Sequence, residues 1–376
     1  MRAVTSCCAD HPGTECIPWP TGEIQEPALY FEGDDLYDSM RAVIRQARRS
    51  IDVETYILAA DEVGRSLAAE LADRSRAGVQ VRVSVDAIGS GGVFSRELES
   101  CLEGDGIEVR RFARWSWRHP SQVYRRDHRK LLVIDDRIAY LGGFNIHRES
   151  SRRVVGRSRW RDTHVRVEGR LAAEAGALFD AFWSGDLDWS PDRGARGDVL
   201  VPNHSRTCRR RLHCLYNRVL RSARLRLDLT TPYFVPDRRT RDELLRAARR
   251  GVDVRLLLPA KSDVPLARWA ARAAYRRLLD AGVRIYEYQP RMLHAKTAVV
   301  DRIVATAGTA NLDSRSLLVN HELNLFSATR VFCENLIEQF EKDLESSTEV
   351  TSSTWPGRPR ASLLSETVGR IFRRWL

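Results

Sequence analysis

Apolar residues recur along the chain with two periods, and the order of these patterns repeats once. Apolar positions three or four residues apart predict amphipathic helices, whereas short runs with alternating polar positions predict strands. A helix, a strand and a second helix follow one another in each copy, at 36–48, 51–57 and 64–76, and then at 212–223, 225–231 and 239–249. The repeat therefore predicts two halves that share one fold.

The second helix of each copy ends at a glycine that leads into another apolar strand. Gly78 precedes a strand over 79–86, and Gly251 precedes a strand over 252–258. Glycine readily adopts the left-handed conformation that terminates many helices, so both positions indicate C-caps before buried strands. The alternation predicts an α/β fold with two pseudo-symmetric lobes, each a mixed, largely parallel sheet flanked by helices.

Changes in composition divide the chain into segments. Proline, glycine, aspartate and arginine are concentrated around 191–206, which predicts a linker, and a polar stretch with prolines follows the second copy. The expected organisation is an N-terminal tail, a first lobe, the linker, a second lobe and a C-terminal segment, at 1–20, 21–190, 191–206, 207–348 and 349–376.

Each copy also contains the same set of polar residues at identical spacing. The sets are His128, Lys130, Asp135, Gly142, Gly143 and Asn145, and then His294, Lys296, Asp301, Gly308, Thr309 and Asn311. Residues two apart in a strand point to one face, so each histidine and its lysine project together. The aspartates predict tight turns into return strands, which bring each asparagine back beside its histidine and lysine.

Lysine is rare in this chain, which gives two of these positions extra weight. It occurs only at Lys130, Lys261, Lys296 and Lys342, whereas arginine is abundant. An ammonium group is a compact point charge that a guanidinium does not replace. One such histidine–lysine pair would ordinarily be a solvated strand end, but two copies with one spacing predict two half-sites of an active site between the lobes.

These sets resemble the paired HKD motifs of the phospholipase D superfamily, and the wider sequence resembles the bacterial cardiolipin synthases. The wider resemblance spans about 27–346 and rests on the segments 53–56, 160–164, 231–237, 311–316 and 320–322. Many relatives begin with two membrane-spanning helices, and no window here reaches about 18 apolar residues. Gly143 stands where the superfamily often has serine, so the hydroxyl of Thr309 has no counterpart in the first half.

The resemblance implies a transferase that moves a phosphatidyl group from one phospholipid to the hydroxyl of another, with phosphatidylglycerol as the expected donor and acceptor. Attack at phosphorus concentrates charge on the phosphate oxygens. Lysine and asparagine donors can stabilise that charge without a metal or another cofactor. The expected phosphate-binding residues are Lys130, Asn145, Lys296, Thr309 and Asn311.

The two histidines are expected to divide the chemistry between them. One would attack and form a phosphohistidine, while the other would protonate the leaving oxygen and then deprotonate the acceptor. The resemblance implies that His128 is the nucleophile and His294 the general acid and base. The local patterns alone are too symmetric to separate these roles.

Carboxylates complete the candidate site. A histidine usually needs a carboxylate to fix its tautomer, and position and resemblance favour Asp162 and Glu322, with ordinary surface carboxylates as the alternative. Asp135 and Asp301 belong to the candidate catalytic set through the motif. Their place beyond the apolar strands favours a turn-shaping role.

Aromatic residues near the motifs have two interpretations. Phe112, Trp115 and Trp117 precede the first motif and would form either a lip for lipid or ordinary surface packing. Tyr233 and Phe234 are expected to pack near the floor of the site.

The formal net charge of +11 favours an anionic partner, although a bias towards arginine would produce the same value. We expect phospholipid substrates and an anionic membrane surface as partners, and no nucleic acid. The cysteines show no zinc or disulfide pattern, and residues 1–20 contain no signal-like apolar run. The expected location is therefore peripheral, at the cytoplasmic face of the cell membrane.

The C-terminal residues 362–376 predict an amphipathic helix. Its apolar stripe is Leu364, Val368, Ile371, Phe372 and Trp375, with arginines beside it. Aromatic residues on one face and arginines near the other are typical of a helix that lies in a membrane surface. The alternative is a stripe that docks on the catalytic lobes.

The sequence leaves three other functions open. A nucleic-acid phosphodiesterase would fit the positive charge, although many such nucleases carry one motif per chain and dimerise. A hydrolytic phospholipase D would differ only in using water as the acceptor. A non-catalytic membrane scaffold is disfavoured because both motifs are intact.

Overall fold

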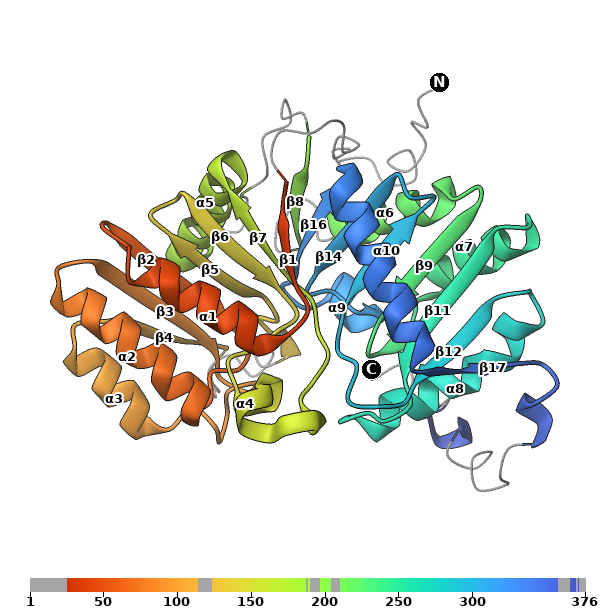
Figure 1. The fold of residues 1–376 in the computed structure, drawn as a ribbon, viewed down its shortest axis with the longest axis horizontal. Coiled ribbons are helices and arrows are strands. Elements are labelled where there is room, and N and C mark those ends of the chain that lie inside the picture. Colours follow the sequence, from red (N-terminus) through yellow and green to blue (C-terminus); the bar gives the residue numbers. More distant parts are fainter. Residues whose placement is uncertain are drawn as a thin grey trace.

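Two β-sheets lie side by side, one in each half of the chain, and helices flank both of them (Figure 1). The computed structural model describes residues 26–113, 124–186, 189, 197–203, 210–357, 366–369 and 371. The expectation of two pseudo-symmetric α/β lobes is confirmed.

The first lobe contains a seven-stranded sheet in the order β1-β7-β6-β5-β2-β3-β4. Its strands are β1 (Ala28–Tyr30), β2 (Ser50–Thr55), β3 (Gln80–Asp86), β4 (Glu108–Phe112), β5 (Lys130–Ile134), β6 (Ile138–Gly142) and β7 (His164–Glu168). Its helices are α1 (Gly33–Ile44), α2 (Glu62–Arg76), α3 (Arg96–Gly104), the short α4 (Arg152–Val155) and α5 (Gly169–Ser184). Short 3-10 turns at Arg148–Ser150 and Gly156–Ser158 flank α4.

The second lobe contains an eight-stranded sheet in the order β17-β12-β11-β9-β13-β14-β16-β8. Its strands are β8 (Val199–Pro202), β9 (Arg226–Thr230), β11 (Asp253–Pro259), β12 (Arg284–Tyr288), β13 (Thr297–Val300), β14 (Val304–Gly308), β16 (Leu323–Ser327) and β17 (Ser347–Val350). A separate pair is β10 (Phe234–Val235) with β15 (Leu312–Asp313). The helices are α6 (Arg211–Ser222), α7 (Arg238–Arg249), α8 (Pro265–Leu279), α9 (Ser314–Leu318) and α10 (Arg330–Glu345), followed by a 3-10 turn at Trp355–Gly357.

The sheets are mixed, as expected, but the prediction that they are largely parallel was wrong. Among the described strands, parallel pairing is confined to β2, β3 and β4 in the first sheet and to β9, β11 and β12 in the second. The motif strands β5 and β13 form antiparallel hairpins with β6 and β14, which confirms the predicted tight turns into return strands. Both residues of each turn, Asp135-Asp136 and Asp301-Arg302, have positive φ, and such two-residue turns join antiparallel strands.

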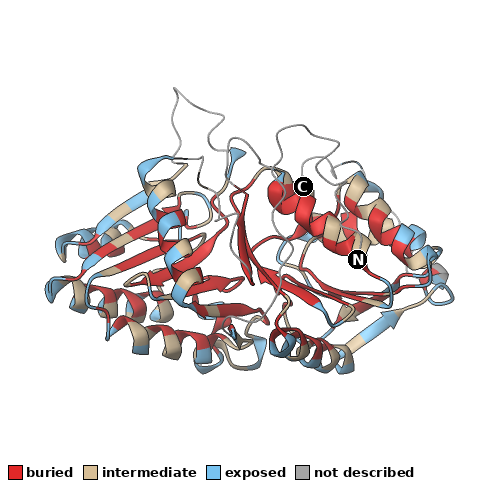
Figure 2. Ribbon diagram, turned by 90° about the horizontal axis from the view of Figure 1, so that it is seen from above, coloured by how far each residue is buried: buried red, intermediate tan, exposed pale blue. Residues whose placement is uncertain are grey.

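Apolar side chains from both lobes form one shared core between the two sheets. Leu131, Val133 and Leu141 of the first lobe belong to the same buried cluster as Val299 and Leu325 of the second. Figure 2 shows this burial along the strands of both sheets, while the outer faces of the helices are exposed. The shared core fixes the two motif hairpins relative to each other.

Two segments outside the expected lobes join the second sheet. Residues 191–206, expected as a linker, contribute β8, which pairs with β16 at the sheet edge. Strand β17, which crosses the expected boundary at residue 348, pairs with β12.

The described part of the expected C-terminal helix is helical at 366–369 and 371. Glu366 is buried, and Gly369 lies so close to α8 that an added Cβ would be 2.4 Å from the nitrogen of Ala270. Ile371, from the predicted apolar stripe, is 66% exposed. Leu364, Phe372 and Trp375 lie outside the described residues. Within the described ranges, no helix is long and apolar enough to cross a bilayer.

Candidate active site

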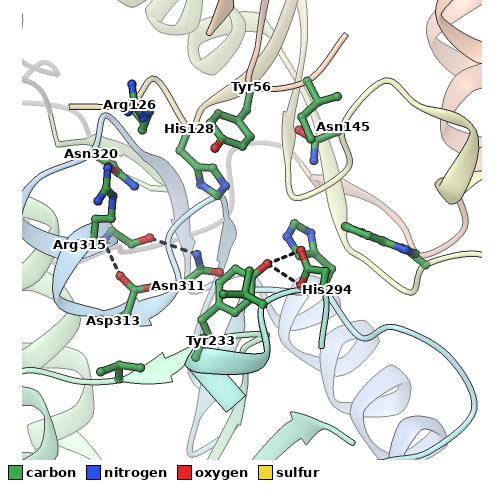
Figure 3. A pocket seen from close by; sticks show the side chains of 17 residues that line it. Tyr56, Arg126, His128, Asn145, Tyr233, His294, Asn311, Asp313, Arg315 and Asn320 are labelled. Atoms are coloured by element: carbon green, nitrogen blue, oxygen red, sulfur yellow. Dashed lines mark hydrogen bonds between the residues drawn. The ribbon is translucent and has the colours of Figure 1, made fainter. Parts of the chain in front are cut away.

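Both motif histidines and both motif asparagines line one cavity of about 330 Å³ between the lobes. Figure 3 shows His128 and His294 projecting into it from opposite sides. Each histidine segment is hydrogen-bonded to the other lobe: the His128 amide donates to the carbonyl of His321 (2.9 Å), and the His294 amide donates to that of Arg161 (2.7 Å). The expectation of one site at the lobe interface therefore agrees with the geometry.

The motif strands hold each lysine against the backbone of its own histidine. The Nζ of Lys130 donates to the carbonyl of His128 (2.7 Å), and the Nζ of Lys296 donates to that of His294. Both lysines are almost completely buried, at 3% and 1% exposure. Neither lysine lines the cavity itself, so the structure places two ammonium charges beside the histidines, where they favour an anion in the cavity.

Each histidine is oriented by a carboxylate from the opposite lobe. The Nδ1 of His128 lies 3.0 Å from Glu322 Oε2, and the Nδ1 of His294 lies 2.6 Å from Asp162 Oδ2. A carboxylate on Nδ1 favours the tautomer whose proton sits there, which leaves Nε2 of His128 free to attack. The Nδ1 of His294 also lies 2.7 Å from the Nζ of Lys296, so Asp162 and Lys296 share that nitrogen. The sequence predicted both carboxylates as orienting residues, but it did not predict that each would contact the histidine of the other lobe.

Burial is the largest influence on the pKa values of the two histidines and the two lysines. It lowers the pKa of His128 against the opposing charge of Glu322, and lowers that of His294 to about 4 with help from Lys296. Burial and the charge of Lys296 lower the pKa of Lys130 to about 7, while burial lowers that of Lys296 to about 8. An anion between the histidines would favour the charged form of all four groups.

The expected phosphate-binding role of Thr309 needs correction. Its hydroxyl donates to Oε2 of Glu322 and accepts from the Leu323 amide (2.9 Å), and Thr309 does not line the cavity. It therefore positions the carboxylate that orients His128. In the first lobe Asp162 occupies the equivalent space, since a Cβ on Gly143 would lie 1.9 Å from its Oδ1.

The motif aspartates lie at the far ends of the strands and do not line the cavity. Their inclusion among the candidate catalytic residues was therefore wrong, whereas the turn-shaping role favoured by their position agrees with the structure. The carboxylate of Asp135 accepts from the amides of residues 48–50, and that of Asp301 from the amides of residues 224–226. These contacts tie each hairpin turn to the start of the neighbouring central strand.

The asparagines have free capacity for hydrogen bonding at the cavity. The Oδ1 atoms of Asn145 and Asn311 are buried without a partner in the described structure, and Nδ2 of Asn311 donates to Ser316 (3.2 Å). Because amide oxygen and nitrogen are assigned from such networks, either amide can present N–H groups to a bound phosphate.

The described residues contain no cluster of three histidine, cysteine or carboxylate side chains that could hold a metal ion. The donors that line the cavity include imidazole, amide and guanidinium groups, which suit a phosphate anion directly.

A family model described as cardiolipin synthase, PLD-like domain, matches residues 40–183 and 216–344. The chain is 33% identical over 363 residues to a cardiolipin synthase of Clostridium perfringens, covering 91% of this chain and 75% of that protein. It is 32% identical to a cardiolipin synthase of Geobacillus kaustophilus, covering 94% of this chain and 72% of that protein.

The chain belongs to the cardiolipin synthase family. The prediction of a phosphatidyltransferase of the phospholipase D superfamily is thereby confirmed. Among solved structures, the phosphatidylserine synthase of Haemophilus influenzae matches with a TM-score of 0.72 and 13% identity, over 96% of this chain and 94% of that one. The polyphosphate kinase of Porphyromonas gingivalis matches with a TM-score of 0.63 and 16% identity, over 93% of this chain and 54% of that one. At such identities these two matches show the fold alone.

Several residues of this cardiolipin synthase-like cavity were not assigned to the site from the sequence. Tyr56 and Trp160 pack beside His128 and His294, with ring centroids 4.9 Å and 5.1 Å apart. Both lie in segments that carried the family resemblance, so that signal was available. Tyr233 was expected at the floor, and it lines the cavity with its hydroxyl on Asp263 (2.7 Å). Nothing in the sequence singled out Asp263.

The aromatic residues before the first motif do not form the cavity wall as far as the structure describes them. Phe112 packs against Phe182 and His321, at 5.1 Å and 5.3 Å between ring centroids. Trp115 and Trp117 lie outside the described residues. Phe234 is buried in the core of the second lobe.

Proposed function

We propose that this protein transfers a phosphatidyl group from one phospholipid, phosphatidylglycerol, to the hydroxyl of a second one through a phosphohistidine, without a metal. The observation that carries the proposal is the pair of opposed histidines in one cavity, each with Nδ1 on a buried carboxylate. Such a pair supplies a nucleophile on one side of a phosphorus atom and an acid on the other.

In the first step, Nε2 of His128 attacks the phosphorus of the donor. A P–N bond forms, the bond from phosphorus to the head-group oxygen breaks, and His294 gives that oxygen a proton. His294 must be protonated for this step, although its pKa is only about 4 in the empty site. The bound phosphate raises that pKa, and Asp162 stabilises the imidazolium.

In the second step, His294 removes the proton of the acceptor hydroxyl. The resulting oxygen attacks phosphorus, the P–N bond breaks, and His128 returns to its neutral form. Lys130 and Lys296, with Asn145 and Asn311, donate to the phosphate oxygens in both steps. Because the asparagines already line the cavity and the lysine charges lie beside it, these groups stabilise the extra charge of each transition state.

The same proposal includes a peripheral location at the cytoplasmic face of the membrane. The net charge of +11 favours an anionic lipid surface, and no nucleic acid is needed as a partner. The exposed position of Ile371 on the helical C-terminal segment is consistent with contact between that segment and lipid.

The test is to incubate the purified protein with radiolabelled phosphatidylglycerol, with and without phosphatidylethanolamine, and to separate the lipid products. The proposal predicts cardiolipin and an equal amount of free glycerol from phosphatidylglycerol alone. Release of phosphatidic acid alone would identify a hydrolase, and incorporation of phosphatidylethanolamine would change the acceptor. A protein with both histidines replaced by alanine is the control for contaminating activity.

A further inference from the structure

Two arginines stand together on one wall of the active-site cavity without a carboxylate partner. Arg126 and Arg315 both line the cavity. Figure 3 shows them with Asn320 on the side beyond His128 and Asn311, away from His294. Neither guanidinium forms an ion pair within the described part of the chain. Like charges brought together in this way usually mark an anion site.

Within the described structure, the guanidinium of Arg126 lacks a hydrogen bond that it could form. Its Nη1 is shielded from solvent and has no hydrogen-bond partner among the described residues. Burial lowers the pKa of Arg126, and the charge of Arg315 lowers it further, while Asp86 opposes the shift. Asp86 itself accepts from the amides of Ile88, Gly89 and Asp127, so its charge is already engaged.

Arg315 is held in place by contacts that leave its charge available. Its Nη2 donates to the carbonyl of Tyr124 (2.9 Å), and its guanidinium lies 5.1 Å from the centre of the Tyr124 ring. Two carboxylates also line the cavity. Burial raises the pKa of one of them, Asp313, and the charge of Arg315 opposes that shift, but neither carboxylate forms an ion pair with Arg126 or Arg315 in the described residues. Asp313 accepts from the Ser316 amide (2.6 Å), and Asp263 accepts from the Tyr233 hydroxyl.

The arginine pair breaks the pseudo-symmetry of the site. The two motifs are offset by the same interval throughout, which places Met292 opposite Arg126 and Glu149 opposite Arg315. Neither of these counterparts lines the cavity. The cavity therefore has one guanidinium-bearing wall and one wall without it, although its catalytic groups are nearly symmetric.

We propose that Arg126 and Arg315 bind the non-reacting phosphodiester of the acceptor phospholipid. This inference rests on the proposed function. The donor brings a single phosphodiester, which must lie between the histidines and their lysines, and its diacylglycerol and leaving glycerol are uncharged. An acceptor phospholipid brings a second phosphodiester, whereas water or free glycerol brings none. Guanidinium groups suit such a phosphate because they donate two parallel hydrogen bonds.

The experiment lets two acceptors compete for one donor. Phosphatidylglycerol is incubated with radiolabelled glycerol, and two products are measured together: cardiolipin, and labelled phosphatidylglycerol formed by exchange. Both arise from the same phosphatidyl group, so their ratio does not depend on the amount of folded enzyme. Arg126→Gln and Arg315→Gln should each lower the ratio of cardiolipin to exchange at least tenfold. Arg126→Lys, which keeps the charge, should restore part of it.

The matched control is Arg238→Gln, which removes the same charge from an α7 side chain that is 90% exposed. It should leave the ratio unchanged. An unchanged ratio in the Arg126 and Arg315 variants would overturn the inference, and so would an equal loss of both products, because the pair would then serve the donor. Wild-type protein that forms exchange product but no cardiolipin would refute the proposed function instead.

Discussion

The crossed carboxylates predict that Asp162→Asn and Glu322→Gln affect different steps of transfer. Asp162 is buried, its Oδ2 lies 2.6 Å from His294, and the same atom lies 3.7 Å from the Nζ of Lys296. A hydrogen bond to a charged group contributes about 1.5–3 kcal/mol. At 1.36 kcal/mol for each factor of ten, its loss should slow the step that needs protonated His294 by about 10- to 150-fold.

A donor with a p-nitrophenol leaving group separates the two carboxylates. Such a group departs without help from an acid, so Asp162→Asn should still release a rapid burst of nitrophenol. Its turnover should then be slow, because His294 must still deprotonate the acceptor. Glu322→Gln should weaken the burst itself, since Glu322 orients the nucleophile.

Rapid-mixing measurements of nitrophenol absorbance provide the readout. Glu338→Gln, which removes an exposed carboxylate paired with Lys342, is the control. A normal burst in Glu322→Gln together with a lost burst in Asp162→Asn would show that the roles of the two histidines are exchanged. Equal effects of both changes on both phases would refute the division of roles.

Three further outcomes follow from the site and the C-terminus. His128→Ala and His294→Ala should each abolish lipid transfer, with a loss of about 10²–10⁴ expected from removing an acid–base group alone; full activity in either variant, or inhibition by EDTA that metal reverses, would contradict the mechanism. The lowered pKa values of Lys130 (about 7) and Lys296 (about 8) mean that both ammonium groups lose their protons as pH rises. The kcat/KM for an anionic lipid should therefore fall between about pH 7 and 9, and a flat profile would contradict this. Removing residues after Arg360 should reduce sedimentation with anionic vesicles but preserve activity on detergent-dispersed lipid, whereas equal vesicle binding would assign the segment to the fold.

The local fold could be predicted because it depends on short-range patterns. The helix ends at Gly78 and Gly251 have positive φ, as the C-cap interpretation requires. The pairing direction of the sheets was harder, because a strand pattern does not encode its neighbour's direction. The exceptions are the turns at Asp135 and Asp301, which were predicted to lead into return strands and whose positive φ values suit such hairpins.

The candidate site, like the fold, was predicted only in part. The spacing of the two motifs was enough to predict that His128 and His294 share one cavity, with their lysines beside them. The partners from the opposite lobe could not be read from spacing, because they depend on how the lobes pack. Thr309 illustrates this, since only the packed structure shows that its hydroxyl is used by Glu322. Asp263 lies in a stretch with no motif at all.

The exchange of carboxylates between the lobes also bears on the history of the chain. A duplicated gene whose ancestor worked as a symmetric pair of identical subunits would inherit this arrangement, since each subunit would lend its carboxylate to the histidine of its twin. After fusion, neither half can regain independence, because its histidine would lose the orienting group. The two halves must therefore have evolved together, and recombination within the chain would be tolerated only where both crossed pairs stay matched.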